Sequence, residues 1–209
     1  MSDDTITTAT ATAAAAAAAT GSGLDVHICA GAVIVRVRGG CPRSVLDNVR
    51  TCEEAGTQYR AVPIACLAGL PVDVLLLKRK KGHWDSPKGH VELHQGETER
   101  ACSLREMSEE AGIHPEDTAF VDGFCHKFTY RNANADHEKT VTWYLFLVLS
   151  ESSETKHDHP ALVVRHFFGH KWLPFAEARE LAYHDHTKSV LALAEAYLVV
   201  GHAPDAPAM

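Results

Sequence analysis

The feature that most constrains this sequence of 209 residues is an apolar run at residues 27–37, His-Ile-Cys-Ala-Gly-Ala-Val-Ile-Val-Arg-Val. Its β-branched residues favour a strand, and the near absence of polar residues indicates that the strand is buried on one or both faces. Residues 71–78, which include Val72, Val74 and three consecutive leucines, predict a second buried strand. We therefore expect the folded structure to begin close to residue 27.

The ends of the chain differ in composition from its middle. Residues 1–24 are mostly Ala and Thr and contain no basic residue, which predicts a disordered, low-complexity tail. We expect one folded domain over residues 25–202 and a short C-terminal tail at residues 203–209, because this length is usual for a single domain.

A helix is predicted over residues 98–111, where Ala, Leu, Glu, Arg and Met predominate. Gly112 is expected to form a left-handed C-terminal cap, and Pro115 follows three residues later. These signals bound the helix more clearly than any other in the chain.

This helix carries three glutamates, Glu106, Glu109 and Glu110, at spacings that place them on one face within a single turn. Like charges this close repel one another, and Arg105, four residues before Glu109, can neutralise only part of the repulsion. A bound Mg²⁺ or Mn²⁺ would compensate the charge, since such cations take carboxylate and phosphate oxygens as ligands. On the helix alone, a solvated acidic surface is the simpler interpretation.

The residues before the helix favour the metal site. The run Pro-Lys-Gly-His-Val-Glu at residues 87–92 supplies a glycine where backbone can approach a ligand closely, and Glu97 adds a carboxylate at the start of the helix. Glu97, seven further residues and the run Arg-Glu-Met-Ser-Glu-Glu-Ala-Gly-Ile at residues 105–113 together resemble the second half of the Nudix box. In the first half, Gly89 precedes Glu97 by seven intervening residues in place of five, which indicates a two-residue insertion within residues 93–96.

The resemblance implies an α+β fold of the Nudix type, an α/β/α sandwich with a mixed β-sheet and a loop-helix-loop catalytic motif. It implies that Glu106, Glu109 and Glu110 bind the metal, with Glu97 as a supporting carboxylate and Arg105 orienting the carboxylates. Among these residues, Glu106, Arg105 and Glu109 are the expected catalytic set. The implied reaction is hydrolysis of a phosphoanhydride by a water that the metal activates.

The remaining segments agree with a mixed architecture. Residues 38–70 are interpreted as an insertion or long connection, with a short helix near residues 44–54. Strands are expected at residues 119–130 and 140–149, joined by a long polar loop. A short strand region at 162–168 and 170–173 and helices at 175–182 and 187–200 complete the prediction.

The substrate is suggested by residues outside the box. The segment at residues 83–92 is similar to the Nudix branch that cleaves diadenosine tetraphosphate asymmetrically to ATP and AMP. This similarity implies that His83 belongs to the substrate site, that Tyr130 stacks on an adenine, and that Lys88 and Lys139 contact phosphates. Taken alone, Tyr130 is more simply interpreted as an aromatic residue at a strand end that packs on the core.

The general base is left open by the sequence. The same branch often has a glutamate shortly before its Trp-Leu pair, here Trp172 and Leu173, but this chain has Arg165, His166 or Phe167 in that region. The base is therefore either Glu106 or a group outside the helix such as His166.

Two alternatives remain beside dinucleoside polyphosphate hydrolysis. One is a Nudix diphosphatase for another polyphosphate, such as a diphosphoinositol phosphate, an RNA cap or a nucleoside triphosphate. The other is a catalytically silent nucleotide-binding module, which the intact carboxylates of the helix disfavour.

The composition of the chain limits the kinds of partner that it can be expected to bind. The net charge of −7 argues against broad nucleic-acid binding, although the basic run at residues 78–81 could attract a polyanion locally. The six scattered cysteines favour reduced thiols in the cytoplasm or nucleus, and no apolar run is long enough to span a membrane. We expect a monomer that acts on a small-molecule substrate.

Overall fold

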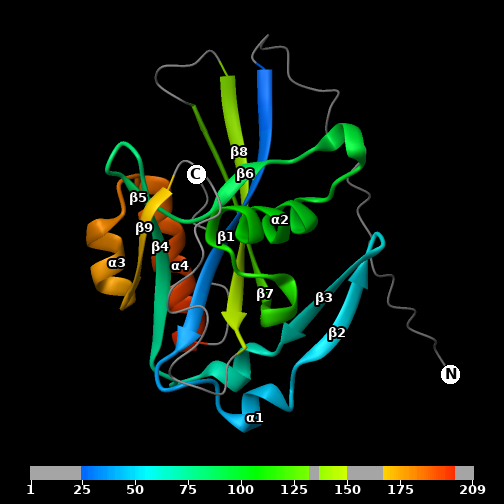
Figure 1. Cartoon of the computed structure of the whole chain (residues 1–209), viewed down its shortest axis with the longest axis vertical. Coiled ribbons are helices and arrows are strands. Elements are labelled where there is room, and N and C mark those ends of the chain that lie inside the picture. Colours follow the sequence, from blue (N-terminus) through cyan, green and yellow to red (C-terminus); the bar gives the residue numbers. More distant parts are fainter. Residues whose placement is uncertain (1–24, 132–136, 150–166, 201–209) are drawn as a thin grey trace, which may run out of the picture.

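The computed structural model of the chain describes residues 25–131, 137–149 and 167–200 (Figure 1). The tails expected at residues 1–24 and 203–209 lie outside the described residues, and so does His166.

Strands, α-helices and short 3₁₀ turns follow one another in mixed order along the described part of the chain. The strands are β1 (Asp25–Val37), β2 (Arg50–Glu54), β3 (Thr57–Val62), β4 (Val72–Arg79), β5 (Trp84–Asp85), β6 (Lys88–His90), β7 (Thr118–Arg131), β8 (His137–Val148) and β9 (Phe167–Leu173). The α-helices are α1 (Arg43–Leu46), α2 (Glu99–Ala111), α3 (Phe175–Leu181) and α4 (Asp185–Val200). Short 3₁₀ turns are η1 (Ile64–Leu67), η2 (Leu93–Gln95) and η3 (Pro115–Asp117).

A mixed sheet organises the described part of the chain, with strand order β2-β3-β7-β8-β1-β4-β5. The pairs β1·β8 and β3·β7 are parallel, whereas the other pairs are antiparallel. β1 lies at the centre, because β8 runs along one side of it while β6 and β4 share the other. The apolar run that predicted a buried strand is therefore confirmed as the middle of the sheet.

Helices cover both faces of this sheet (Figure 1). On one face, Met107 of α2 packs in a cluster with Ile34 of β1. On the other face, Leu191 of α4 and Phe175 of α3 pack in a cluster with Val33 of β1. Successive residues of β1 thus enter different cores, as the alternation of side chains in a strand requires. The fold is the expected α+β sandwich, with a mixed sheet between two layers of helices.

Most predicted elements are confirmed, including strands β1, β4, β7 and β8 and helices α2, α3 and α4. Residues 162–166 of the expected strand region lie outside the described residues, while β9 contains the rest of that region. The six cysteines are all free thiols, as expected. Within the described residues, no helix is both long and apolar enough to cross a membrane.

The helix expected near residues 44–54 is wrong in its extent. α1 ends at Leu46, and the following residues form a hairpin of β2 and β3. The turn is made by Ala55 and Gly56, whose φ angles of 49° and 79° fit the tight left-handed turn that matches strand twist. Because β3 pairs with the distant strand β7, tertiary contacts stabilise a strand where local propensity indicated a helix.

Candidate active site

Helix α2 is capped at both ends, by Gly112 as the sequence predicts and by Thr98, which precedes the helix rather than beginning it. The Thr98 hydroxyl oxygen accepts a hydrogen bond from the Ala101 backbone N–H at 3.1 Å. Gly112 takes a left-handed φ of 64°, and its N–H donates to the Ser108 carbonyl oxygen at 3.0 Å. These caps determine where the helix begins and ends, and so determine where its glutamates lie along the sheet.

The two-residue insertion before the helix is accommodated within the loop itself. Residues 93–95 form the turn η2, and Gly96 reverses the chain with a φ of 73°. Glu97 then points back into the loop, where its Oε2 accepts a hydrogen bond from the Glu92 N–H at 2.8 Å. The insertion therefore leaves Glu97 in place beside α2.

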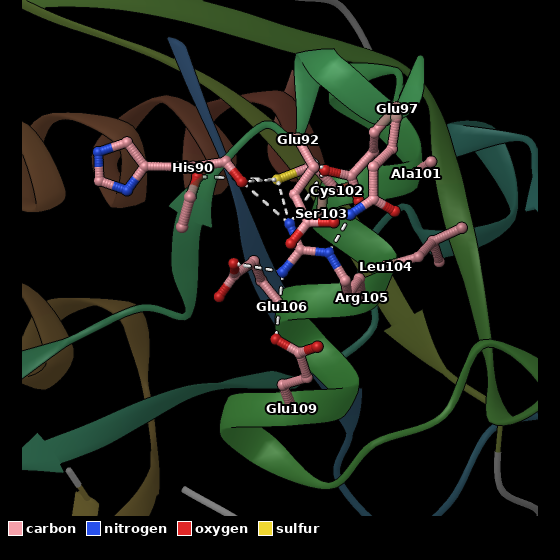
Figure 2. A network of polar contacts seen from close by, with 12 residues as sticks. His90, Glu92, Glu97, Ala101, Cys102, Ser103, Leu104, Arg105, Glu106 and Glu109 are labelled. Atoms are coloured by element: carbon pink, nitrogen blue, oxygen red, sulfur yellow. Dashed lines mark hydrogen bonds and ion pairs between the residues drawn. The ribbon is translucent and has the colours of Figure 1, made fainter. Parts of the chain in front are cut away.

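Arg105 is the centre of the polar network at α2 (Figure 2). Its Nε and Nη2 donate to the two carboxylate oxygens of Glu97 at 2.8 and 3.0 Å. Its Nη1 donates to Oε1 of Glu106 at 2.7 Å and to Oε2 of Glu109 at 3.1 Å. A further bond joins Nη2 to the His90 carbonyl oxygen at 2.9 Å. One guanidinium therefore orients three carboxylates and the preceding loop, because its planar fork offers donors in several directions.

The electrostatics of this network follow from burial and from Arg105. The hydrogen bonds with Glu97 raise the pKa of Arg105. Burial raises the pKa of Glu97, but the hydrogen bonds from Arg105 and from the Glu92 backbone outweigh it, so that this pKa is lowered. In Glu106 burial prevails over Arg105, and the pKa is raised. Glu106 is thus the carboxylate of this network for which the fold supplies too little positive charge.

Gly89 brings the backbone of β6 directly against Glu106. A Cβ atom at this position would lie only 1.8 Å from Oε1 of Glu106. The glycine of the Pro-Lys-Gly-His run is therefore required by close approach, since any side chain would displace the carboxylate.

Glu110 lies on the neighbouring side of the helix. Its Oε2 accepts a hydrogen bond from the Lys88 N–H at 3.0 Å, and its Oε1 lies 3.7 Å from Nη2 of Arg79. Only 13% of the side chain is exposed, and burial raises its pKa to about 7. Arg79 comes from the basic run at residues 78–81, so one member of that run belongs to the carboxylate site.

The donor set of Glu106, Glu109 and Glu110 fits a hard divalent cation. All donors are carboxylate oxygens. Burial raises the pKa of Glu106 and of Glu110, as expected at a site that lacks positive charge. Among the described residues, no three His, Cys, Asp or Glu side chains converge closely enough to enclose a metal ion. The same oxygens now engage Arg105, Arg79 and the Lys88 N–H, so that binding a cation requires some of them to turn.

The predicted substrate residues lie on the sheet face that α4 covers. Tyr130 is half-buried and stacks on His186 of α4, with ring centroids 4.4 Å apart and an interplanar angle of 10°. Lys139 lies directly opposite Tyr130 in the pairing of β7 with β8. His83 stacks on Tyr183 at 3.5 Å.

Lys88 is held by a partner that the sequence did not reveal. Its ammonium donates to the buried carboxylate of Asp85, which also accepts a hydrogen bond from the Thr187 hydroxyl at 2.6 Å. The Lys88 ammonium also lies 5.7 Å from the centre of the Trp143 ring. The charge predicted to meet phosphate is therefore already compensated in part.

The sequence reasoning missed Asp85, Thr187, His184 and His186. Asp85 lies in the segment at residues 83–92, but the resemblance implies no role for it, and the other three stand in no recognisable spacing with the box. Only the packing of the N-terminal end of α4 against β5 and β7 brings the four together. The sole sequence signal was the unusual density of histidines and aromatics at residues 183–186.

Comparison with known proteins identifies the family. A model of the NUDIX domain family matches residues 58–193, more than half of the chain. The chain therefore belongs to the Nudix family.

Within that family, it is similar to proteins named bis(5'-nucleosyl)-tetraphosphatase [asymmetrical]. The protein of Sus scrofa is 34% identical over 122 residues, which cover 57% of this chain and 76% of the relative. That of Mus musculus is 32% identical over 124 residues with the same coverage. The crystal structure of the Caenorhabditis elegans Ap4A hydrolase superposes with a TM-score of 0.54 at 24% identity, covering 84% of this chain and all of the other, which shows the shared fold.

Proposed function

We propose that this protein is a metal-dependent hydrolase of dinucleoside polyphosphates, which cleaves diadenosine tetraphosphate to ATP and AMP. The observation that carries the proposal is the set of carboxylates on α2, organised by Arg105 beside a glycine that admits close approach. The similarity to the asymmetrical tetraphosphatases supports the choice of substrate.

The metal would be Mg²⁺ or Mn²⁺, held by Glu106, Glu109 and Glu110. When bound, such an ion neutralises phosphate oxygens and lowers the pKa of a coordinated water. Arg105 positions Glu106 and Glu109 for this role, because both carboxylates share its Nη1.

A proton must leave the attacking water, and two groups are proposed to receive it. The first is Glu106, whose Oε1 accepts the hydrogen bond from Arg105. Burial raises the pKa of the Glu106 carboxyl, which suits a proton acceptor. The second candidate is His166, which lies outside the described residues. The pH profiles of kcat for Glu106→Gln and His166→Gln would separate these two assignments. Only loss of the true proton acceptor removes the rise of kcat with increasing pH.

The substrate residues are proposed to act on the opposite face of the sheet. Tyr130 and His83 offer aromatic rings to the nucleoside bases, and Lys139 offers an ammonium to phosphate. Lys88 would contribute mainly through its backbone contact with Glu110 and through a charge shared with Asp85.

The expected setting is the cytoplasm or nucleus, with the protein acting as a monomer. All six cysteines are free in the structure, which supports a reducing compartment.

The test is a hydrolysis assay on the purified full chain with diadenosine tetraphosphate and Mg²⁺ or Mn²⁺, followed by separation of the products. Equal amounts of ATP and AMP are expected. Production of ADP alone would contradict the asymmetric reaction, and no turnover of any dinucleoside polyphosphate with either metal would contradict the proposed function.

A further inference from the structure

Three histidines outside the predicted site gather near the starts of β1 and β8, where these strands project beyond the helices (Figure 1). Nδ1 of His27 lies 3.1 Å from Nε2 of His90 on β6. The ring of His137 stacks on that of His27, with centroids 4.1 Å apart and an interplanar angle of 14°. Strands β1, β6 and β8 are neighbours in the sheet, so this group is held by backbone pairing.

Lys139 adds a permanent positive charge to this group. It pairs with His27 across β1 and β8, and the alternation of β8 places it on the same face as His137. The pKa of His90 is lowered by desolvation of its ring and then by Lys139, His27 and His137. None of the effects on His90 from the described residues comes from a carboxylate.

Imidazole rings and an ammonium group this close together are unfavourable unless an acceptor takes the hydrogen bonds from their N–H groups. Within the described residues, the Nε2 atom of His137 is buried and has no hydrogen-bond partner. A close contact between two imidazole nitrogens needs one of them to be unprotonated, whereas an anion can accept from several N–H groups at once. Because Lys139 adds a positive charge beside the rings, the chemistry of the group favours an anion over a metal cation.

The group also adjoins the carboxylate site through His90. The carbonyl oxygen of this residue binds Arg105, while its ring is directed away from the network towards His27 (Figure 2). The preceding residue, Gly89, touches Glu106. On its other side, Lys139 lies opposite Tyr130. The histidines therefore adjoin the carboxylate site through the backbone of β6, while their rings lie on the same sheet face as the aromatic ring proposed to bind a base.

We propose that His27, His90, His137 and Lys139 form a phosphate subsite, which binds a phosphate group of the polyphosphate chain other than the one attacked. The identity of the bound chain rests on the proposed function, whereas the capacity to bind a polyphosphate anion does not. The subsite would favour longer polyphosphate chains, since a short chain that reaches the carboxylates leaves the histidines empty.

The test measures binding of inorganic tripolyphosphate to the metal-free full chain by titration calorimetry. The double variant His27→Gln, His137→Gln is compared with His114→Gln, which changes an exposed histidine before η3. We expect the double variant to bind at least about tenfold more weakly and the control to bind as the unchanged protein does, because hydrogen bonds from charged donors are the strong ones.

Binding by the unchanged protein should also tighten as the pH falls from 8 to 6, because a bound polyphosphate favours the protonated form of an imidazole ring beside it. Equal melting temperatures would show that the variants fold. If the double variant does not fold, His90→Gln, which changes an exposed ring, replaces it in the binding measurement. Unchanged affinity in these folded variants, or no binding by the unchanged protein, would overturn the subsite.

A second readout separates this proposal from the proposed function. The ratio of kcat/KM for diadenosine tetraphosphate to that for diadenosine triphosphate should fall in the double variant. If no dinucleoside polyphosphate were hydrolysed while tripolyphosphate binding still depended on the histidines, the proposed function would fail and the anion subsite would stand.

Discussion

Among single residues, Arg105 and the three glutamates of α2 depend on one another most directly. Arg105 holds Glu106 and Glu109 at 2.7 and 3.1 Å, while Glu110 turns to Lys88 and Arg79. Burial, more than mutual repulsion, raises the pKa of Glu106 and of Glu110, which is consistent with a site that stores a cost in stability for a function.

Replacing Glu109 or Glu110 by Gln should lower kcat by at least about two orders of magnitude, as expected for ligands of a catalytic metal. The fold should survive, because neither change removes apolar packing. Steady-state kinetics and circular dichroism check these outcomes, with the exposed Glu180→Gln of α3 as a matched control. Near-normal rates in both variants would show that the metal lies elsewhere.

The Gly89→Ala substitution should inactivate the protein by displacing Glu106. The new Cβ would lie 1.8 Å from Oε1 of Glu106, so the carboxylate must leave its bond with Arg105. We expect kcat to fall at least about tenfold, the effect of a small misplacement in a catalytic group. Gly169→Ala is the control, because its Cβ would meet nothing closer than 3.9 Å. Equal activity of the two variants would contradict the close packing.

His186 should make the protein sensitive to acid. Burial lowers its pKa from 6.5 to about 4, with a further contribution from Lys88. The unfolded chain therefore binds this proton more readily than the folded protein, and stability is lost as the pH falls from about 6.5 to about 4. The loss should be about 1–2 kcal/mol, since the ring is partly exposed and its charge partly screened. Urea unfolding at pH 7.5 and 4.5 should show a smaller loss for His186→Gln; an equal loss would mean that the folded state protonates the ring freely.

At the scale of elements, α2 and the loop before it act as one unit. The caps at Thr98 and Gly112 set the ends of the helix, and the bonds from Arg105 to Glu97 and His90 fasten the lengthened loop to it. The lengthened loop contains the turn η2, and its last carboxylate, Glu97, contacts both Arg105 and the Glu92 backbone.

Arg105→Lys should loosen this unit while preserving the charge. A lysine cannot reproduce the paired bonds to Glu97 together with those to Glu106 and His90, because its ammonium is a single point of donors. We expect a loss of about 2–3 kcal/mol in stability and at least a tenfold fall in kcat, with faster hydrogen exchange at residues 90–97. The exposed Arg43→Lys, which alters a pair with Asp47, should change neither measurement. Unchanged exchange in the loop would contradict the fastening role of Arg105.

At the scale of the whole molecule, Asp85 joins β5 and β6 to α4. The carboxylate is 1% exposed and binds the Lys88 ammonium, the Ser86 N–H and the Thr187 hydroxyl. One residue of an edge strand thereby connects segments that are a hundred residues apart in the chain.

Asp85→Ala should therefore destabilise the whole protein by about 3–5 kcal/mol, because Lys88, only 14% exposed, would lose its counter-charge. Denaturant unfolding measures the effect. Asp47→Ala, which breaks an exposed pair, should cost no more than about 0.5 kcal/mol. A loss of that small size at Asp85 would show that water can replace the carboxylate.

Local pattern determined much of this protein. The apolar run of β1, the caps of α2 and the spacing of its glutamates each depend on residues within a few positions of one another, where propensity and periodicity act directly. The family and the carboxylates of the candidate site could therefore be read from the sequence, and with them the class of fold.

Only the tertiary structure decided which distant residues meet. Strand register and helix packing produce the strand β2, the ion pair of Arg79 with Glu110, the hydrogen bond from Thr187 to Asp85 and the group around His27. Register and packing are set by the summed burial of many side chains, so no short spacing in the sequence announces them. The carboxylate helix and its Arg105 were thus predictable, while the contacts of Arg79 and of the Lys88 backbone with Glu110 were not.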